Sequence, residues 1–202
     1  VEANSYFRDG APAVKEVQYL GLDSNQSSQD LLTTGKIDWV GQFIANPDAV
    51  TASGDIATMN NQQDPTTIIT CSNADLGCTG PQTDPAVRQA INLVIDRASI
   101  ADKAFAGLPA ASNPAFVLLP RDEQWLGDPA NGESPQSPDV AAAQAILEAA
   151  GYTKGSDGFY GKDGTAIELD LFSPDGWTDY NDTAQLVSEE ARDYAYSAVY
   201  AL

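Results

Sequence analysis

Carboxylates are the abundant side chains in this sequence that could do acid–base chemistry. The chain of 202 residues contains 29 aspartates and glutamates and no histidine. Without histidine these residues cannot form a Ser-His-Asp or Cys-His catalytic site, nor a histidine-ligated metal site. The chemistry left open is hydrolysis by a pair of carboxyl groups and the binding of calcium by oxygen ligands.

The stretch FSPDGWTDY, residues 172–180, gathers several groups able to contact a ligand. It follows an apolar segment and precedes a helical one, and ligands of open α/β sheets bind in loops at strand ends. Gly176 would let a backbone approach closely, and Trp177 offers a flat surface. Asp175 or Asp179 could meet an amine, or the two could serve a hydrolase if their carboxyl groups stand ~5–10 Å apart. The other interpretation is an ordinary loop with a helix cap.

Cys71 and Cys78 bracket the polar segment CSNADLGC. Two cysteines at this spacing can form a disulfide, which favours an exported protein because disulfides are rare in the cytosol. The alternative is two small buried thiols. Two ligands are too few for a structural zinc site, so we expect no metal.

A helix must carry the segment TDPAVRQAINLVIDRASIADKAF, residues 83–105. Asp84 is suited to cap it and Pro85 to its first position. Arg88 and the pair Asp96-Arg97 are expected to hold structure through ion pairs or bonds to backbone carbonyls, because a cation near a helix N-terminus is unfavourable on its own. One apolar stripe at helical spacing comprises Val87, Ala90, Ile91, Val94, Ile95, Ala98 and Ala101.

The other elements alternate between strand and helix patterns. The predicted strands are 14–22, 36–40 and 66–71, with a short helix at 27–35 and mostly loop at 46–65 and 107–138. Further helices are predicted at 137–152, begun by Ser137, and at 179–202, begun near Asp182. A β-hairpin is predicted at 158–172, with Asp163-Gly164 as its turn and Ile167, Leu169 and Leu171 on one face. This alternation predicts an α/β fold in which helices pack on a sheet.

Charge and composition exclude several classes of function. The formal net charge is −19 and is spread along the chain, so binding to nucleic acid or to anionic lipid is disfavoured. The apolar content of 43% supports a folded core, and no apolar run approaches the ~20 residues of a membrane helix. We therefore expect a folded domain with no nucleic acid partner and no cofactor.

Four segments, in order, resemble the solute-binding proteins of ABC importers, family 5, the oligopeptide- and dipeptide-binding type. The first two are NSYFRDGAPAVKEVQYL at 4–20 and DLLTTGKIDWV at 30–40, in which Lys36 replaces the family's usual acidic residue. The other two are the helix DPAVRQAINLVIDRASI at 84–100 and SPDVAAAQAILEAAGY at 137–152. The resemblance extends from residue 4 to about residue 190.

The resemblance implies a fold and a role. The fold would be a periplasmic-binding-protein-like lobe of type II, with a mixed sheet and packed helices. Residues 1–66 would be the end of the first lobe and 67–202 part of the second, incomplete at its C-terminus, in a longer protein. Such proteins lie outside the cytoplasm, as cell-surface lipoproteins or periplasmic proteins. They close around a small peptide or other solute and deliver it to the membrane permease of an ABC importer, without catalysis.

The resemblance also implies a ligand region near the hinge. Its candidate residues fall in two groups, one before the signature helix and one in the loop 173–177: Thr70, Ser72 and Asn73, and Ser173, Asp175, Gly176 and Trp177. Relatives of similar pattern take peptides, nickel or oligosaccharides, so the solute stays open. Two other functions stay open as well: a carboxylate-dependent glycoside hydrolase and a non-catalytic exported interaction module.

Overall fold

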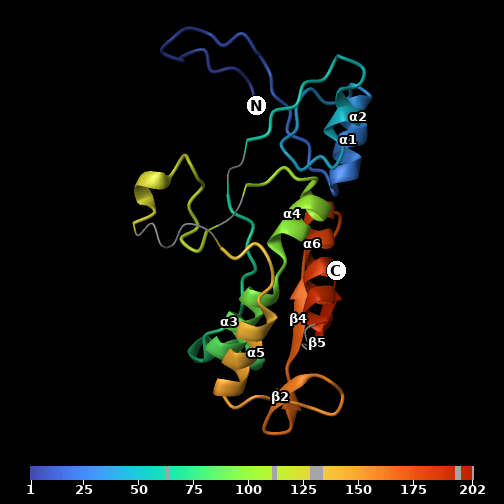
Figure 1. Ribbon diagram of the computed structural model, residues 1–202. Coiled ribbons are helices and arrows are strands. Elements are labelled where there is room, and N and C mark those ends of the chain that lie inside the picture. The colour runs from blue at the N-terminus through green and yellow to red at the C-terminus, as the bar shows by residue number, and fades with distance from the viewer. Residues whose placement is uncertain (62–63, 111–112, 128–133, 194–196, 202) are drawn as a thin grey trace.

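The computed structural model describes residues 1–61, 64–110, 113–127, 134–193 and 197–201. Figure 1 shows an elongated molecule, with α1 and α2 at one end, the hairpin around β2 at the other, and the longer helices between them. The elements described are, in chain order, α1 (Asn25–Thr33), α2 (Pro47–Thr51), η1 (Ala74–Leu76), η2 (Pro81–Thr83), α3 (Pro85–Val94), α4 (Arg97–Phe105), η3 (Glu123–Trp125), α5 (Val140–Ala149), β1 (Thr153–Lys154), β2 (Tyr160–Lys162), β3 (Thr165–Ala166), β4 (Glu168–Phe172), α6 (Thr178–Asp193) and β5 (Ser197–Ala201).

Helix α1 confirms the short helix predicted near residue 30, but begins earlier. Its N-cap is Ser24, whose side chain accepts a hydrogen bond from the amide of Ser27. The helix ends before Gly35, which has φ +67. The predicted loop 46–65 contains one short helix, α2, which Asn46 caps by accepting from the amide of Ala49.

The segment 83–105, which we call the signature segment, forms two helices rather than the one predicted. Helix α3 begins as expected, with Asp84 as N-cap and Pro85 at the first position. The backbone is extended at Ile95 (φ −72, ψ 121), and Asp96 caps α4 by accepting from the amide of Ser99 at 2.9 Å. This break rotates the second half of the stripe, so that Ala98 is exposed while Ile100 and Ala104 are buried.

The core lies where α3, α5 and the end of α6 meet the hairpin. Its buried members are Val87, Ala90, Val94, Ala143, Leu147, Tyr152, Tyr160, Ile167 and Ala191. The predicted helix at 137–152 is confirmed as α5, with Asp139 as its cap in place of Ser137 and Gly151 (φ +87) just past its end. A second, smaller cluster of Ile100, Ala104 and Val187 joins α4 to α6.

The predicted hairpin is confirmed around Asp163-Gly164, with φ values of +53 and +79. Strands β2 and β3 pair antiparallel there, and β1 adds to β2. After the hairpin, Ile167 is buried, and the chain continues as β4, in which Leu169 and Leu171 are half-buried. Strand β4 pairs in parallel with β5, from Glu168↔Ser197 to Phe172↔Ala201, so β4, α6 and β5 form a βαβ unit.

The third helix prediction is wrong at both of its ends. Helix α6 begins at Thr178, four residues before Asp182, and ends at Asp193. Residues 197–201, which the helical pattern had included, form β5. Tyr194, which the predicted helix also included, lies outside the described residues. Residues 197–201 form a strand because they pair with β4, and a local sequence pattern does not reveal such a distant partner.

The strands predicted at 14–22, 36–40 and 66–71 do not form. Residue Glu16 makes an isolated bridge with Glu2, and Val17 donates from its amide to the carbonyl of Val1 at 2.7 Å. The remaining residues of these segments lack strand pairing in the described structure. A β-prone run needs a neighbouring strand to satisfy its backbone groups.

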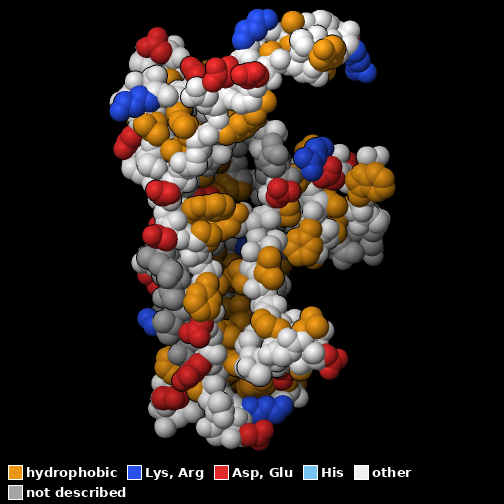
Figure 2. All heavy atoms as spheres, turned by 180° about the vertical axis from the view of Figure 1, so that it is seen from behind, with side chains coloured by type: hydrophobic (Ala, Val, Ile, Leu, Met, Phe, Trp, Pro, Cys, Tyr) orange, Lys and Arg blue, Asp and Glu red, His pale blue; other side chains and the backbone are white. Residues whose placement is uncertain are grey.

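These unpaired segments leave apolar side chains exposed, such as Trp39 at 81% and Ile69 at 91%. Figure 2 shows hydrophobic side chains along the middle of one face, with acidic side chains along one border. Among the described helices, none has both the length and the apolar character that crossing a membrane requires.

Candidate functional site

The loop 173–177 meets the start of α1, at the end of the molecule opposite the hairpin (Figure 1). The amide of Asn25 donates to the carbonyl of Gly176 at 3.1 Å. Gly176 has φ +76, and a Cβ built there would lie 2.6 Å from the carbonyl oxygen of Asp23 and 2.9 Å from Cβ of Ser24. The close approach expected at Gly176 is therefore made to another segment of the chain.

Asn25 extends this contact into the first turn of α6. Its Nδ2 donates to Oγ1 of Thr178 at 3.3 Å and to Oδ1 of Asp179 at 3.2 Å. Gln42 in turn donates from Nε2 to the carbonyl of Asn25 at 2.9 Å. We call the contacts of residues 23–25 with residues 176–179, together with the bond from Gln42 to Asn25, the seam.

Asp179 is the buried carboxylate of the seam, with 7% of its surface exposed. Burial raises its pKa, and hydrogen bonds from its own amide, from Asn25 and from the amide of Tyr180 oppose that rise. Its carboxylate is thus occupied by seam contacts and by the N-terminus of α6.

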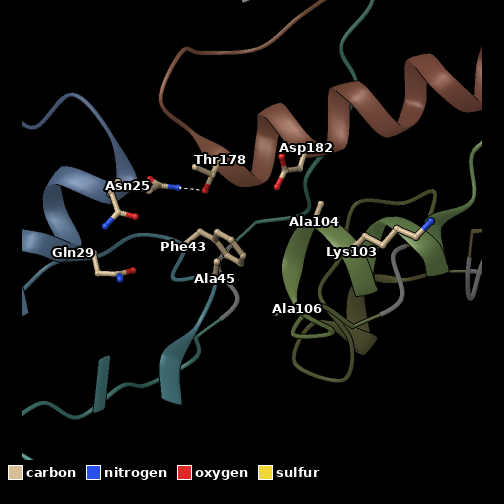
Figure 3. A pocket seen from close by; sticks show the side chains of 10 residues that line it. Asn25, Gln29, Phe43, Ala45, Lys103, Ala104, Ala106, Thr178 and Asp182 are labelled. Carbon is tan, nitrogen blue, oxygen red and sulfur yellow. Dashed lines mark hydrogen bonds between the residues drawn. The ribbon is translucent and has the colours of Figure 1, made fainter. Parts of the chain in front are cut away.

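A cavity of about 180 Å³ adjoins the seam. Two parts of the chain that are distant in sequence form its walls (Figure 3). One wall is Asn25, Gln26, Gln29, Phe43 and Ala45, and the other is Lys103, Ala104, Ala106, Thr178 and Asp182. Phe43 also packs edge-on against Phe105, with ring centroids 5.6 Å apart.

The cavity lining combines apolar side chains, neutral polar groups and two charged side chains, Lys103 and Asp182. Phe43 and the alanines supply the apolar surface, while Asn25, Gln29 and Thr178 supply amide and hydroxyl groups. In Figure 3 Lys103 extends away from Phe43, and Asp182 lies on the α6 side. Such a set can hydrogen-bond a neutral polar or cationic group and pack against its apolar part.

Ser72 and Asn73 lie in the disulfide loop 71–78 that precedes α3, and Thr70 comes directly before that loop. Cys71 and Cys78 are joined by a disulfide with a Cα–Cα distance of 5.4 Å. Asn73 accepts at Oδ1 from the amide of Asp75 and at its carbonyl from Leu76 and Cys78, so it shapes its own loop. Thr70 and Asn73 are exposed and Ser72 is half-buried.

The predicted residues of the loop 173–177 have different surroundings. Ser173 is half-buried and donates from Oγ to Oδ1 of Asn181. Asp175 is exposed, while Trp177 is 47% exposed and packs edge-on against Tyr180 at 5.3 Å. The structure therefore brings the loop to α1, while the hydrogen bonds of Asn73 stay within the disulfide loop.

The charged residues of the signature segment form hydrogen bonds with backbone groups, as expected. Arg88 donates from Nη1 to the carbonyls of Gln82 at 2.8 Å and Thr83 at 3.0 Å. Arg97 donates to the carbonyls of Asn92 and Pro135, both at 3.0 Å. The amide of Asp96 donates to Oε2 of Glu190, whose pKa is raised by burial.

The structure brings three residues that were not predicted as site residues to the seam and the cavity: Asn25, Phe43 and Asp182. The signal available for Asn25 was its place directly after a capping serine, which marks a helix start but no partner. Among the described residues, no group of three or more His, Cys, Asp or Glu side chains is arranged to hold a metal ion.

Comparison with known proteins gives the family. Residues 1–194 match the family model described as Bacterial extracellular solute-binding proteins, family 5 Middle. Protein XP55 of Streptomyces lividans is 34% identical over 109 residues, which are 54% of this chain and 19% of that protein.

Solved structures with the same fold include two oligopeptide-binding proteins. The mannohexaose-bound periplasmic oligopeptide-binding protein of Thermotoga maritima gives a TM-score of 0.72 at 23% identity, covering 88% of this chain and 34% of that one. AppA of Bacillus subtilis, in complex with a nonapeptide, gives 0.65 at 20% identity, covering 99% and 38%. The chain thus spans about a third of the length of these structures, and its α/β fold is that of part of a type II periplasmic binding protein. Because the family model matches almost the whole chain, the protein belongs to the bacterial extracellular solute-binding proteins of family 5.

Proposed function

We propose that the chain is part of the extracytoplasmic receptor of an ABC importer, which binds a small solute and releases it to a membrane permease. The family match over residues 1–194 carries this proposal, and a cavity whose walls come from two separate parts of the chain, residues 25–45 and 103–182, supports it. A receptor of two lobes binds its solute between them, so a cavity of this construction is expected where they meet.

The proposed lobes are residues 1–66 and 67–202. Thr70, Ser72, Asn73, Ser173, Asp175, Gly176 and Trp177 remain the proposed cleft residues, and Asn25, Phe43 and Asp182 are added to them. The exposure of Thr70, Asn73 and Asp175 supports their availability to a solute. Gly176 serves the cleft indirectly, because its approach to Asp23 and Ser24 shapes the seam beside the cavity.

The solute we propose is a short peptide. Amide and hydroxyl groups beside apolar side chains suit a peptide backbone with a small side chain. The acidic surface, with a formal net charge of −19, disfavours anionic solutes. The Thermotoga protein, named as oligopeptide-binding, was solved with mannohexaose, so an oligosaccharide is the solute class to compare.

Location outside the cytoplasm is part of the same proposal, as a periplasmic protein or a cell-surface lipoprotein. The family description and the Cys71–Cys78 disulfide support it, since such bonds persist in oxidising compartments.

Catalysis by carboxylates has less support. Asp179 is buried and bonded to Asn25, whereas Asp175 is exposed. An acid–base pair needs both carboxyl groups to face one bond across a cleft. We therefore propose a binding protein without enzymatic activity.

The test is a thermal-shift panel on the full-length protein, with di- to pentapeptides, mannohexaose and Ni²⁺ as separate arms. A peptide at about 100 times its Kd should add about 2.7 kcal/mol to the free energy of unfolding. That should raise Tm measurably, since each kcal/mol is worth roughly 2–4 °C in a domain of about 150–250 residues and less in a longer chain. Mass spectrometry of the recovered peptide should show it intact.

Cavity variants sharpen the test. Phe43→Ala should reduce the peptide-induced Tm shift, whereas Phe116→Ala, at a residue 63% exposed and away from the cavity lining, should leave that shift unchanged. If the protein hydrolyses any panel member, and Asp175→Asn or Asp179→Asn abolishes that hydrolysis, the result would contradict the proposal and support an enzyme.

A further inference from the structure

The seam contains a glycine that the neighbouring segment requires. Position 176 has a positive φ of +76, and its Cβ would meet the backbone oxygen of Asp23 at 2.6 Å. Backbone atoms cannot swing aside as a flexible side chain can, so a larger residue there must push the two segments apart. The requirement for glycine thus comes from packing between segments as well as from the turn.

Asn25 supplies the hydrogen bonds on the other side. Its amide, its carbonyl and its side-chain amide all have partners: Gly176, Gln42, and Thr178 with Asp179. The bonds to residues 176–179 join positions about 150 apart in sequence, and the bond to Asp179 lies at a buried carboxylate. Bonds to a charged acceptor of low exposure are stronger than neutral surface bonds.

The seam and the cavity share residues. Asn25 and Thr178 belong to both, so residues 1–66 and 67–202 must be in contact at the seam for the two cavity walls to face each other. Gly176 itself is not a lining residue of the cavity. A change at Gly176 therefore alters closure without replacing any lining side chain.

We propose that Gly176 and Asn25 form a closing clasp, which sets the fraction of molecules in which residues 1–66 lie against residues 67–202 and the cavity is formed. This inference rests on the proposed two-lobed receptor. In such a receptor the apparent Kd equals the intrinsic Kd divided by the competent fraction, so Gly176, which does not line the cavity, sets affinity without touching the solute. Gly176 is then a positioning residue.

Hydrogen-exchange mass spectrometry of the solute-free protein tests the clasp directly. Gly176→Ala should speed amide exchange about tenfold or more in peptides covering 23–33 and 173–182, because local opening exposes those amides. Exchange in α3 and α5, which form the main core, should stay unchanged. The matched control is Gly54→Ala, which has the same backbone constraint (φ +80) but open space around its Cβ, and should leave both seam segments unchanged.

If Gly176→Ala unfolds the whole chain, the variant Asn25→Ala tests the clasp instead. It removes the side-chain bonds to Thr178 and Asp179 and keeps the backbone free of strain. It should speed exchange in the same two segments, and unchanged or uniformly faster exchange in both variants overturns the clasp.

The result is separable from the proposed function, because no solute is present in the exchange experiment. Where the panel identifies a peptide, Gly176→Ala should raise its apparent Kd in proportion to the loss of closed molecules. An unaltered Kd in a variant with an opened seam would also overturn the clasp. Failure of every panel member to bind, with seam exchange as expected, would count against the solute and leave the clasp standing.

Discussion

Asp179 shows how burial changes the role of a single side chain. Asp175 and Asp179 were both candidates in the segment 172–180, yet the first is exposed and the second, in the first turn of α6, is 7% exposed and bonded to Asn25. Desolvation disfavours the charged form, which raises the pKa of Asp179 above that of an ordinary aspartate. The group therefore binds its proton more tightly in the folded protein than in the unfolded chain.

This shift gives a pH-dependent prediction. Because the folded pKa is raised, the stabilising contribution of Asp179 is fully present below the unfolded pKa of ~3.9 and is lost as pH rises through the folded value. Asp179→Asn keeps an acceptor for Asn25 and removes the charge. The variant should have a higher free energy of unfolding than the unchanged protein at pH 7, and this difference should vanish near pH 4. Urea titrations at the two pH values measure it.

The exposed neighbour provides the control. Asp175→Asn should change stability by less than about 0.5 kcal/mol at both pH values, as most surface substitutions do. A stability difference for Asp179→Asn that is the same at pH 4 and pH 7 would contradict a raised pKa.

The break between α3 and α4 shows how a helix boundary is set within an apolar stripe. The stripe continued through Ile95 and Ala98, so one helix was predicted, but Asp96 instead caps a new helix through Ser99. Aspartate competes with the helix for backbone amides, and its own amide is satisfied by Glu190 of α6. The second helix can thereby turn Ile100 and Ala104 toward Val187.

We predict that Asp96→Ala destabilises the protein by about 1 kcal/mol, the usual effect of losing an N-cap acceptor. Asp96→Asn should recover most of that loss because Asn also caps well. Urea unfolding followed by far-UV circular dichroism measures both. Asp102→Ala, at an exposed position within the same helix, is the matched control, and an equal loss there would mean that the cap is not the cause.

Charge dominates the behaviour of the chain as a whole. The formal net charge of −19 comes from 29 acidic and 10 basic residues. Two ion pairs among the described residues, Arg121–Asp122 and Arg8–Asp9, join adjacent residues and offset little of it. Self-repulsion of this size weakens a compact state. Screening by salt should relieve it, because the Debye length falls from about 10 Å at 0.1 M to about 3 Å at 1 M.

We therefore predict that Tm rises as NaCl increases from 0.02 to 0.5 M, by a few degrees on the usual relation between free energy and Tm. Differential scanning calorimetry measures the change. KCl should give the same rise as NaCl, since screening does not distinguish the cations. A rise with one salt alone would indicate a specific ion site and contradict screening as the cause.

The elements that sequence analysis predicted correctly are those governed by neighbouring residues. Asp84-Pro85 begins α3, Gly151 lies just past the end of α5, and Asp163-Gly164 turns the hairpin, as expected. Each depends on a backbone preference or on a bond to a residue a few positions away. The family resemblance, which uses the same local patterns, was sufficient to anticipate the α/β fold.

Contacts between distant residues could not be predicted from such local patterns. The strand at 197–201 forms because β4 lies beside it, and the runs at 14–22, 36–40 and 66–71 stay unpaired in the described structure because they lack such a neighbour. The meeting of Asn25 with Gly176 and Asp179 likewise joins segments about 150 residues apart. Caps and turns are encoded by short-range bonds, whereas strand pairing and close approach depend on which surfaces the completed fold brings together.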